Sequence, residues 1–256
     1  QIAQEFEVLK PIKVEGLKTI LGAVALLMAF ACTKNQAEGN GQVSFVLTGD
    51  YQIADQTRSN VSQYTTLPSS EDFTITITDA SSAPVWAGKL SDWDSATLLK
   101  AGNYKVTATY GDIEDEGFDK PFFTGAADFT IAGAQTAEVT VNVSLGNTII
   151  MIGCSDNFRN YYKDYTFRLT RNGSEIVTFV KDEAKAAFVD AYKFTLEGTV
   201  VSETRTQTFS KDYASLKEAT AYTIMFDASN VGSNSITITF NNAVETVELG
   251  DMELND

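Results

Sequence analysis

The sequence predicts an all-β protein of two tandem antiparallel β-sandwich domains of transthyretin or immunoglobulin type, with one or two short helices. Three observations support this fold class: apolar and polar residues alternate through most of the chain, an Asn-Gly pair links two alternating runs, and an internal repeat keeps its order. Successive side chains of a strand point to opposite faces, so alternation indicates half-buried strands. A length of 256 residues suits one large domain or two small ones.

The alternating runs define the predicted strands. Each has apolar side chains on one face and mainly threonine, serine or other polar side chains on the other, as in an antiparallel sheet with one wet face. The clearest runs are residues 43–47, 73–78, 104–110, 139–145, 165–169 and 236–240.

The Asn-Gly pair at 172–173 predicts a hairpin, because a two-residue type I′ turn needs positive φ at both positions. Such a loop pairs Arg171 with Ser174. The same register then pairs Leu169 with Ile176 and keeps apolar residues on one face.

Two segments predict short helices. Residues 156–162 form one or two turns if Asp156 caps them. Residues 182–190 are the second candidate because they are rich in alanine, although Phe188 and Val189 favour a strand.

The internal repeat suggests the domain division. Residues 72–77 resemble 164–169, residues 99–106 resemble 216–224, and residues 137–147 resemble 245–255. Because the matches keep the same order, we expect tandem domains. The first β-sandwich then covers 42–146 and the second 147–256, each near the common domain size of about 100 residues.

The N-terminal segment predicts export. An apolar run ends at Ala31 and Cys32, and it is too short for a spanning helix, which needs about 20 apolar residues. We interpret 1–31 as a signal peptide with upstream residues and 32–41 as a lipidated cysteine with its tether. A lipidated Cys32 predicts an outer-membrane lipoprotein at the cell surface or on the periplasmic face. An ordinary signal peptide with an incidental cysteine is the alternative.

Composition excludes several function classes. The chain has 34 acidic and 19 basic residues, a net charge of −15, and therefore no basic surface for nucleic acid. It contains no histidine, which excludes Ser-His-Asp triads, Cys-His dyads and histidine zinc sites. Cys154 lies in an apolar run and is expected to be a buried, inert thiol. We therefore expect that the protein is not an enzyme and that it binds no cofactor and no metal ion.

The most specific strings are GNYKVTATYGD at 102–112 and GFDKPFFTG at 117–125. They resemble a lipoprotein family of Bacteroidota classed as a domain of unknown function, with the motif G-x-Y-x-V-x-A-x-Y-G-D followed by F-x-x-P-x-F-x-G. That family is distantly similar to fimbrillin-like pilus subunits and adhesins. The resemblance implies a secreted, lipid-anchored pair of β-sandwiches, and it brings no catalytic residues.

Aromatic side chains supply the candidate binding surface, because exposed aromatic groups mark interfaces. The candidates are Phe118, Phe122, Phe123, Tyr161 and Tyr162. The alternative is structural: the loop at 118–123 plugs one end of the first sandwich, and the tyrosines pack a short helix onto the second. The acidic loop at 112–117 is expected to be solvated, since a calcium loop of EF-hand type would need a glutamate where Phe123 stands.

Arg58 lies in a polar stretch between two predicted strands. In fimbrillin-like pilins a trypsin-like cut at such an arginine allows β-strand addition, so the resemblance implies a possible processing site. We predict a lipid-anchored envelope protein with a structural, adhesive or fimbria-related role. A glycan-binding accessory lipoprotein is the alternative. The expected partners are the membrane, through the anchor, and a protein or glycan ligand. A monomer is expected, with fimbrial assembly left open.

Overall fold

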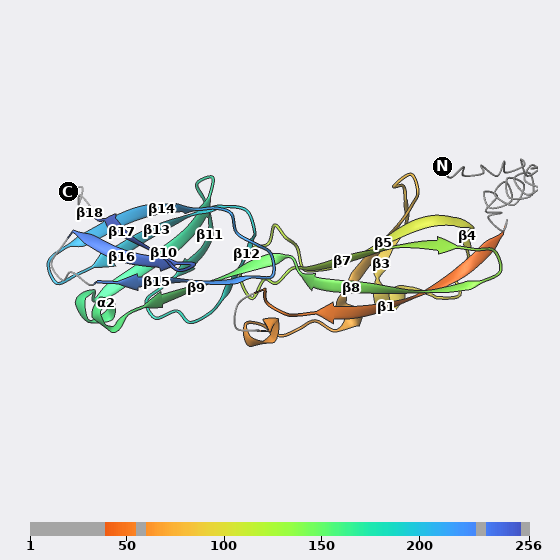
Figure 1. Ribbon diagram of the computed structural model, residues 1–256, viewed down its shortest axis with the longest axis horizontal. Coiled ribbons are helices and arrows are strands. Elements are labelled where there is room, and N and C mark those ends of the chain that lie inside the picture. The colour runs from red at the N-terminus through yellow and green to blue at the C-terminus, as the bar shows by residue number, and fades with distance from the viewer. Residues whose placement is uncertain (1–38, 55–59, 229–233, 252–256) are drawn as a thin grey trace, which may run out of the picture.

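The computed structural model describes residues 39–54, 60–228 and 234–251, and its regular secondary structure is nearly all β (Figure 1). The all-β prediction is therefore confirmed. The two halves of the chain lie end to end along the long axis, with β1 starting at one pole and the C-terminal strands lying at the other. Within the described ranges, the model has no helix with the length and apolar character needed to cross a membrane.

The first half, up to residue 146, forms one sheet in the order β3-β2-β5-β7-β8-β1-β4. Its strands are β1 (Asn40–Asp50), β2 (Thr74–Asp79), β3 (Pro84–Lys89), β4 (Leu99–Lys100), β5 (Gly102–Tyr110), β7 (Phe123–Ile131) and β8 (Thr136–Leu145). The short 3-10 helices are η2 (Val61–Gln63), η3 (Ser70–Asp72) and η4 (Leu90–Asp92). Strand β6 (Gly117–Phe118) leaves this half for the other.

The second half, from residue 147, forms a five-stranded sheet, β11-β10-β13-β14-β18, and a six-stranded sheet, β17-β16-β15-β9-β12-β6. Its elements are β9 (Asn147–Cys154), α2 (Asp156–Tyr161), β10 (Asp164–Arg171), β11 (Ser174–Phe179), β12 (Ala187–Asp190), β13 (Phe194–Val201), β14 (Thr206–Tyr213), β15 (Ala221–Asp227), β16 (Ser235–Phe240), β17 (Ala243–Glu248) and β18 (Gly250–Asp251).

The two halves repeat one topology. The order β3-β2-β5-β7 recurs as β11-β10-β13-β14, and β8-β1-β4 recurs as β15-β9-β12. In both halves the first strand pairs in parallel with a late strand, β1 with β8 and β9 with β15. The expectation of purely antiparallel sheets is therefore wrong. A parallel neighbour needs a long crossover, and the intervening strands of each half provide it.

The strands that correspond between the two halves are not all the ones predicted from the sequence. Residues 164–169 do match 72–77, because both lie in the second strand of their half. However, 216–224 lead into β15, the counterpart of β8 rather than of β5. Among the described residues of the first half, strands β16 to β18 have no counterpart. Generic alternation looks alike in every strand, which explains the mistaken matches.

Helix α2 is confirmed where it was predicted, but the predicted cap at Asp156 is wrong: the N-cap is Ser155, whose hydroxyl accepts from the Phe158 amide. The helix predicted over 182–190 is wrong, because residues 187–190 form β12. Ala187, Phe188 and Val189 are all buried in succession. A strand covered on both faces buries consecutive side chains, so burial overrides the helix preference of alanine.

The Asn-Gly hairpin is confirmed at its turn, where Arg171 pairs with Ser174 and both turn residues have positive φ. A bulge beyond Leu169 then shifts the register, so Leu169 faces Val177 and not Ile176. The shift turns Val177 and Phe179 toward the core, where both are buried.

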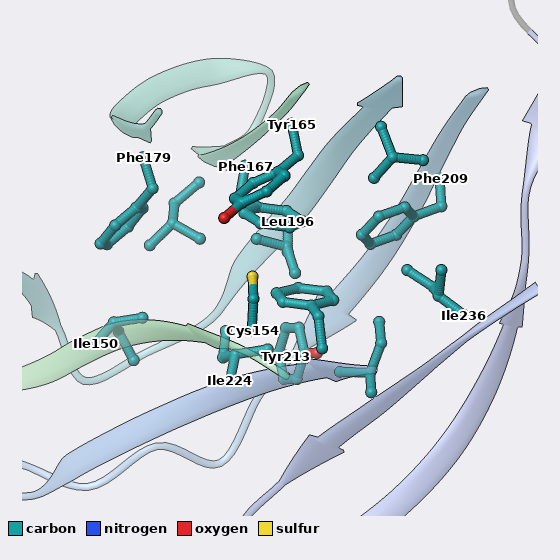
Figure 2. Packing of buried hydrophobic residues seen from close by; sticks show 14 of the residues in the cluster. Ile150, Cys154, Tyr165, Phe167, Phe179, Leu196, Phe209, Tyr213, Ile224 and Ile236 are labelled. Carbon is teal, nitrogen blue, oxygen red and sulfur yellow. The ribbon is translucent and has the colours of Figure 1, made fainter. Parts of the chain in front are cut away.

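The buried hydrophobic residues form two clusters, one for each half. Figure 2 shows part of the second, in which Cys154 points from β9 toward the aromatic rings of the facing sheet. Most apolar side chains of the predicted strands are buried, and Phe45 and Tyr104 are partly buried. The fully or nearly fully buried ones include Ile75, Val106, Val141, Phe167, Tyr222, Ile236 and Ile238. The domain bounds 42–146 and 147–256 stay a prediction.

Candidate functional site at the junction of the two halves

The aromatic loop between β5 and β7 reaches across to the second half. Its strand β6 pairs with β12, with Phe118 opposite Ala187. The Phe118 ring packs edge-on against Phe179, with the centroids 5.1 Å apart. The loop can turn back because Gly111 has φ +77°, and a Cβ there would lie 2.3 Å from the Pro121 carbonyl oxygen. Phe118 is therefore a structural contact between the halves.

The other two phenylalanines of the loop belong to the first half. Phe123 is completely buried, and its ring meets the Tyr51 ring edge-on with the centroids 5.4 Å apart. Phe122 covers Gly146, where a Cβ would lie 2.7 Å from the Phe122 ring. The prediction of an aromatic binding surface is wrong for Phe123, whose ring is fully buried. Phe118 and Phe122 are partly buried, and their role in binding stays a prediction. These contacts give the loop a structural role, and whether it plugs one end of a sandwich stays a prediction.

Tyr162 is also packed away, so it cannot serve as a stacking platform. The centroid of its ring lies 4.7 Å from that of Phe158 in α2. Burial raises the pKa of the Tyr162 hydroxyl to about 12. Tyr161 is partly buried and meets the Tyr162 ring edge-on at 4.8 Å. The aromatic side chains of this helix attach it to the second core.

A nearly buried ion pair fastens the loop to the second half. The Glu116 and Arg171 side chains are 11% and 20% exposed, and Arg171 Nη1 lies 2.6 Å from Glu116 Oε2. The other Glu116 oxygen accepts from the Asp190 amide at 2.6 Å. Arg171 also donates to the carbonyls of Asp190 and Lys193. Charge-assisted hydrogen bonds therefore use both oxygens of the carboxylate.

The acidic loop was expected to be solvated, and this is wrong for Glu116. The rest of the loop agrees with the expectation: Asp112 accepts from the Glu114 amide, and Asp115 makes an exposed ion pair with Lys120 at 2.7 Å. Among the residues that the model describes, no group of three or more His, Cys, Asp or Glu side chains is placed to hold a metal ion.

A second set of contacts joins the halves on the opposite side of the junction. The Ala54 amide donates to the Ala219 carbonyl at 2.7 Å, and the Ala219 amide donates to the Asn147 carbonyl at 2.8 Å. Asn147 is fully buried, and its side-chain oxygen accepts from the Phe122 amide. In addition, Ile149 and Phe188 of the second half belong to the core of the first. The two halves thus share buried side chains.

Cys154 is a buried free thiol, as predicted. Burial raises its pKa to about 11, so the thiol stays protonated at neutral pH. We expect the folded Cys32→Ala variant, in which Cys154 is the only thiol, to resist iodoacetamide at pH 8 and to react within minutes in urea. Mass spectrometry measures the labelled fraction. Rapid labelling of the folded protein would show that the thiol is accessible.

Cys32 and Arg58 lie outside the described residues. Lipidation at Cys32 and processing at Arg58 therefore stay predictions.

A family model described as a domain of unknown function, DUF4493, matches residues 39–253. No curated protein sequence matches the chain. Among solved structures, a fimbrial assembly protein from Parabacteroides distasonis aligns with a TM-score of 0.47 at 11% identity, covering 82% of this chain and 99% of that chain. The fimbrial anchor protein Mfa2 from Porphyromonas gingivalis aligns with a TM-score of 0.44 at 10% identity, covering 81% of this chain and 99% of that chain.

Proposed function

We propose that this chain, which belongs to the DUF4493 family of domains of unknown function, is a lipid-anchored envelope protein with a structural or adhesive role and no catalytic activity. The observation that carries the proposal is its shape. Two β-rich halves lie end to end, and contacts on both sides of the junction hold them together. We take the halves to be two β-sandwich domains, at 42–146 and 147–256.

The position of β1 supports anchoring at one end. β1 begins at Asn40, at the pole of the first half that faces away from the second half (Figure 1). The seven residues 33–39 reach at most roughly 25 Å when fully extended. A lipid on Cys32 would therefore keep the first half near the membrane and direct the second half outward.

The junction supports a mechanical role. A hinge between domains needs a small, polar interface, and such interfaces let domains move. Here β6 crosses to the other half, Glu116 and Arg171 pair almost out of solvent, and three buried residues of the second half belong to the first core. A stiff connection suits a protein that must hold a binding surface away from the membrane.

The C-terminal edge supports a monomer over a polymerising subunit. β17 is the edge strand of its sheet, and Glu245 on it forms an ion pair with Lys211 of the facing sheet. Glu248 on the same strand is exposed. Charged side chains on an edge strand oppose pairing with another chain.

Replacing the anchor tests the proposal. We expect Cys32→Ala to move the protein from the membrane pellet to the soluble fraction, because a lipoprotein cysteine carries the acyl chains that bind the bilayer. Fractionation and palmitate labelling of cells measure this, and Thr33→Ala is the matched control. A labelled, membrane-bound Cys32→Ala protein would refute anchoring at Cys32.

A further inference from the structure

A groove of about 560 Å³ lies at the junction, on the outer face of the six-stranded sheet. This volume is within the usual range of small-ligand sites, about 300–1,000 Å³. Both halves line it: Ala54 comes from the first half, and the β15–β16 surface and the β16–β17 turn come from the second. The Ala54 amide donates to the Ala219 carbonyl, which holds Ala54 at the edge of the groove.

The floor of the groove combines an apolar patch with hydroxyl groups. Met225 is 42% exposed. It lies against β9 at Gly153, where a Cβ would come within 2.7 Å of the Met225 sulfur. Thr239 pairs with Met225 across the strands, and Thr223 lies two residues before Met225 on β15. The missing side chain at Gly153 thus lets the thioether lie along the sheet and offer an apolar surface.

The rim supplies amides and one cation. Asn241 and Asn242 form the β16–β17 turn, with φ of 48° and 65°, and Lys217 lies on the opposite loop. The lining includes no aspartate or glutamate, although the chain carries 34. Within the described ranges, none of these three side chains has a hydrogen bond or an ion pair. Their polar groups are therefore available to a ligand.

Backbone pairing excludes strand addition here. β15 is paired by β16 on one side and by β9 on the other, and β16 is also paired by β17. Their backbone N–H and C=O groups are used along the paired segments, so recognition must come from side chains. Hydroxyls and amides around an apolar patch match a sugar ring, which has C–H groups on its faces and hydroxyl groups at its rim.

We infer that this groove binds a neutral oligosaccharide. Met225 contacts a ring face, and Asn241, Asn242, Thr223 and Thr239 exchange hydrogen bonds with its hydroxyls. The net charge of −15 disfavours sulfated or sialylated chains by long-range repulsion. The inference rests on the proposed binding role and gives it a ligand class.

The test uses the full chain carrying Cys32→Ala, so that failure of anchoring does not affect the binding result. An array of neutral, sulfated and sialylated oligosaccharides is probed first, and the best neutral glycan is then titrated by calorimetry. The double variant Asn241→Gly with Asn242→Gly removes both amides, yet glycine keeps the positive φ of the turn. Asn172→Gly, at the other Asn-containing hairpin turn, is the matched control.

We expect the double variant to lose at least tenfold in affinity and the Asn172→Gly control to bind like the parent. Circular dichroism confirms that both variants are folded. Three results would each overturn the inference: no neutral glycan is bound, only charged glycans are bound, or the double variant binds as tightly as the control. A failure here with normal membrane anchoring would leave the proposed envelope role intact.

Discussion

Glu116→Ala should lower the free energy of unfolding by about 3–5 kcal/mol, because it leaves a largely buried arginine without its partner. The variant also removes the acceptor of the Asp190 amide. Arg171 would keep its bonds to backbone carbonyls but lose its compensating charge. Urea unfolding followed by circular dichroism measures the change.

The control for this prediction is an exposed ion pair. In the pair of Arg168 with Glu197, the side chains are 50% and 37% exposed. We expect Glu197→Ala to cost no more than about 1 kcal/mol, because water and salt screen exposed pairs. Replacing both Glu116 and Arg171 by methionine should recover most of the loss, since no buried charge is left. If Glu116→Ala and Glu197→Ala lowered the free energy of unfolding equally, the junction pair would stabilise the protein no more than an exposed pair does.

The local features of the fold could be predicted because they depend on neighbouring residues. Alternation predicts strands, since the period of side chains along a strand is two. The Asn-Gly turn and the short helix α2 follow from turn and capping chemistry within a few residues. The failure over 187–190 has the opposite cause, because β12 owes its structure to strands on either side of it.

The junction could not be predicted, because its contacts join distant residues. Arg171 is 55 residues from Glu116, and Asp190 is 74 residues from it. Nothing in the string DIEDEG separates the one carboxylate that is nearly buried in its ion pair from those exposed to water. Aromatic residues gave a similar ambiguity, since the sequence cannot tell the buried ring of Phe123 from an exposed one. The groove was missed because threonine, asparagine and methionine have no spacing that signals a binding site.

The largest effect expected in the core follows from Phe167→Ala, which should cost about 3–5 kcal/mol. Phe167 is completely buried, and its ring stacks on Phe226 with the centroids 4.1 Å apart and the planes at 8°. It also contacts Phe158, Tyr165 and Phe209. Truncation removes the ring that joins the two sheets of the second half. Val244→Ala, at a side chain that is 66% exposed, is the control and should change stability little.

The same variant tests whether the halves unfold together. Both tryptophans, Trp86 and Trp93, pack against the first core, so tryptophan fluorescence reports the first half. Because Ile149 and Phe188 come from the second half and fill the first core, unfolding of the second half should remove them and destabilise the first. We therefore expect Phe167→Ala to lower the urea midpoint seen by fluorescence together with the midpoint seen by circular dichroism. A fluorescence midpoint that stays at the wild-type value would mean that the halves unfold independently and that the junction does not couple them.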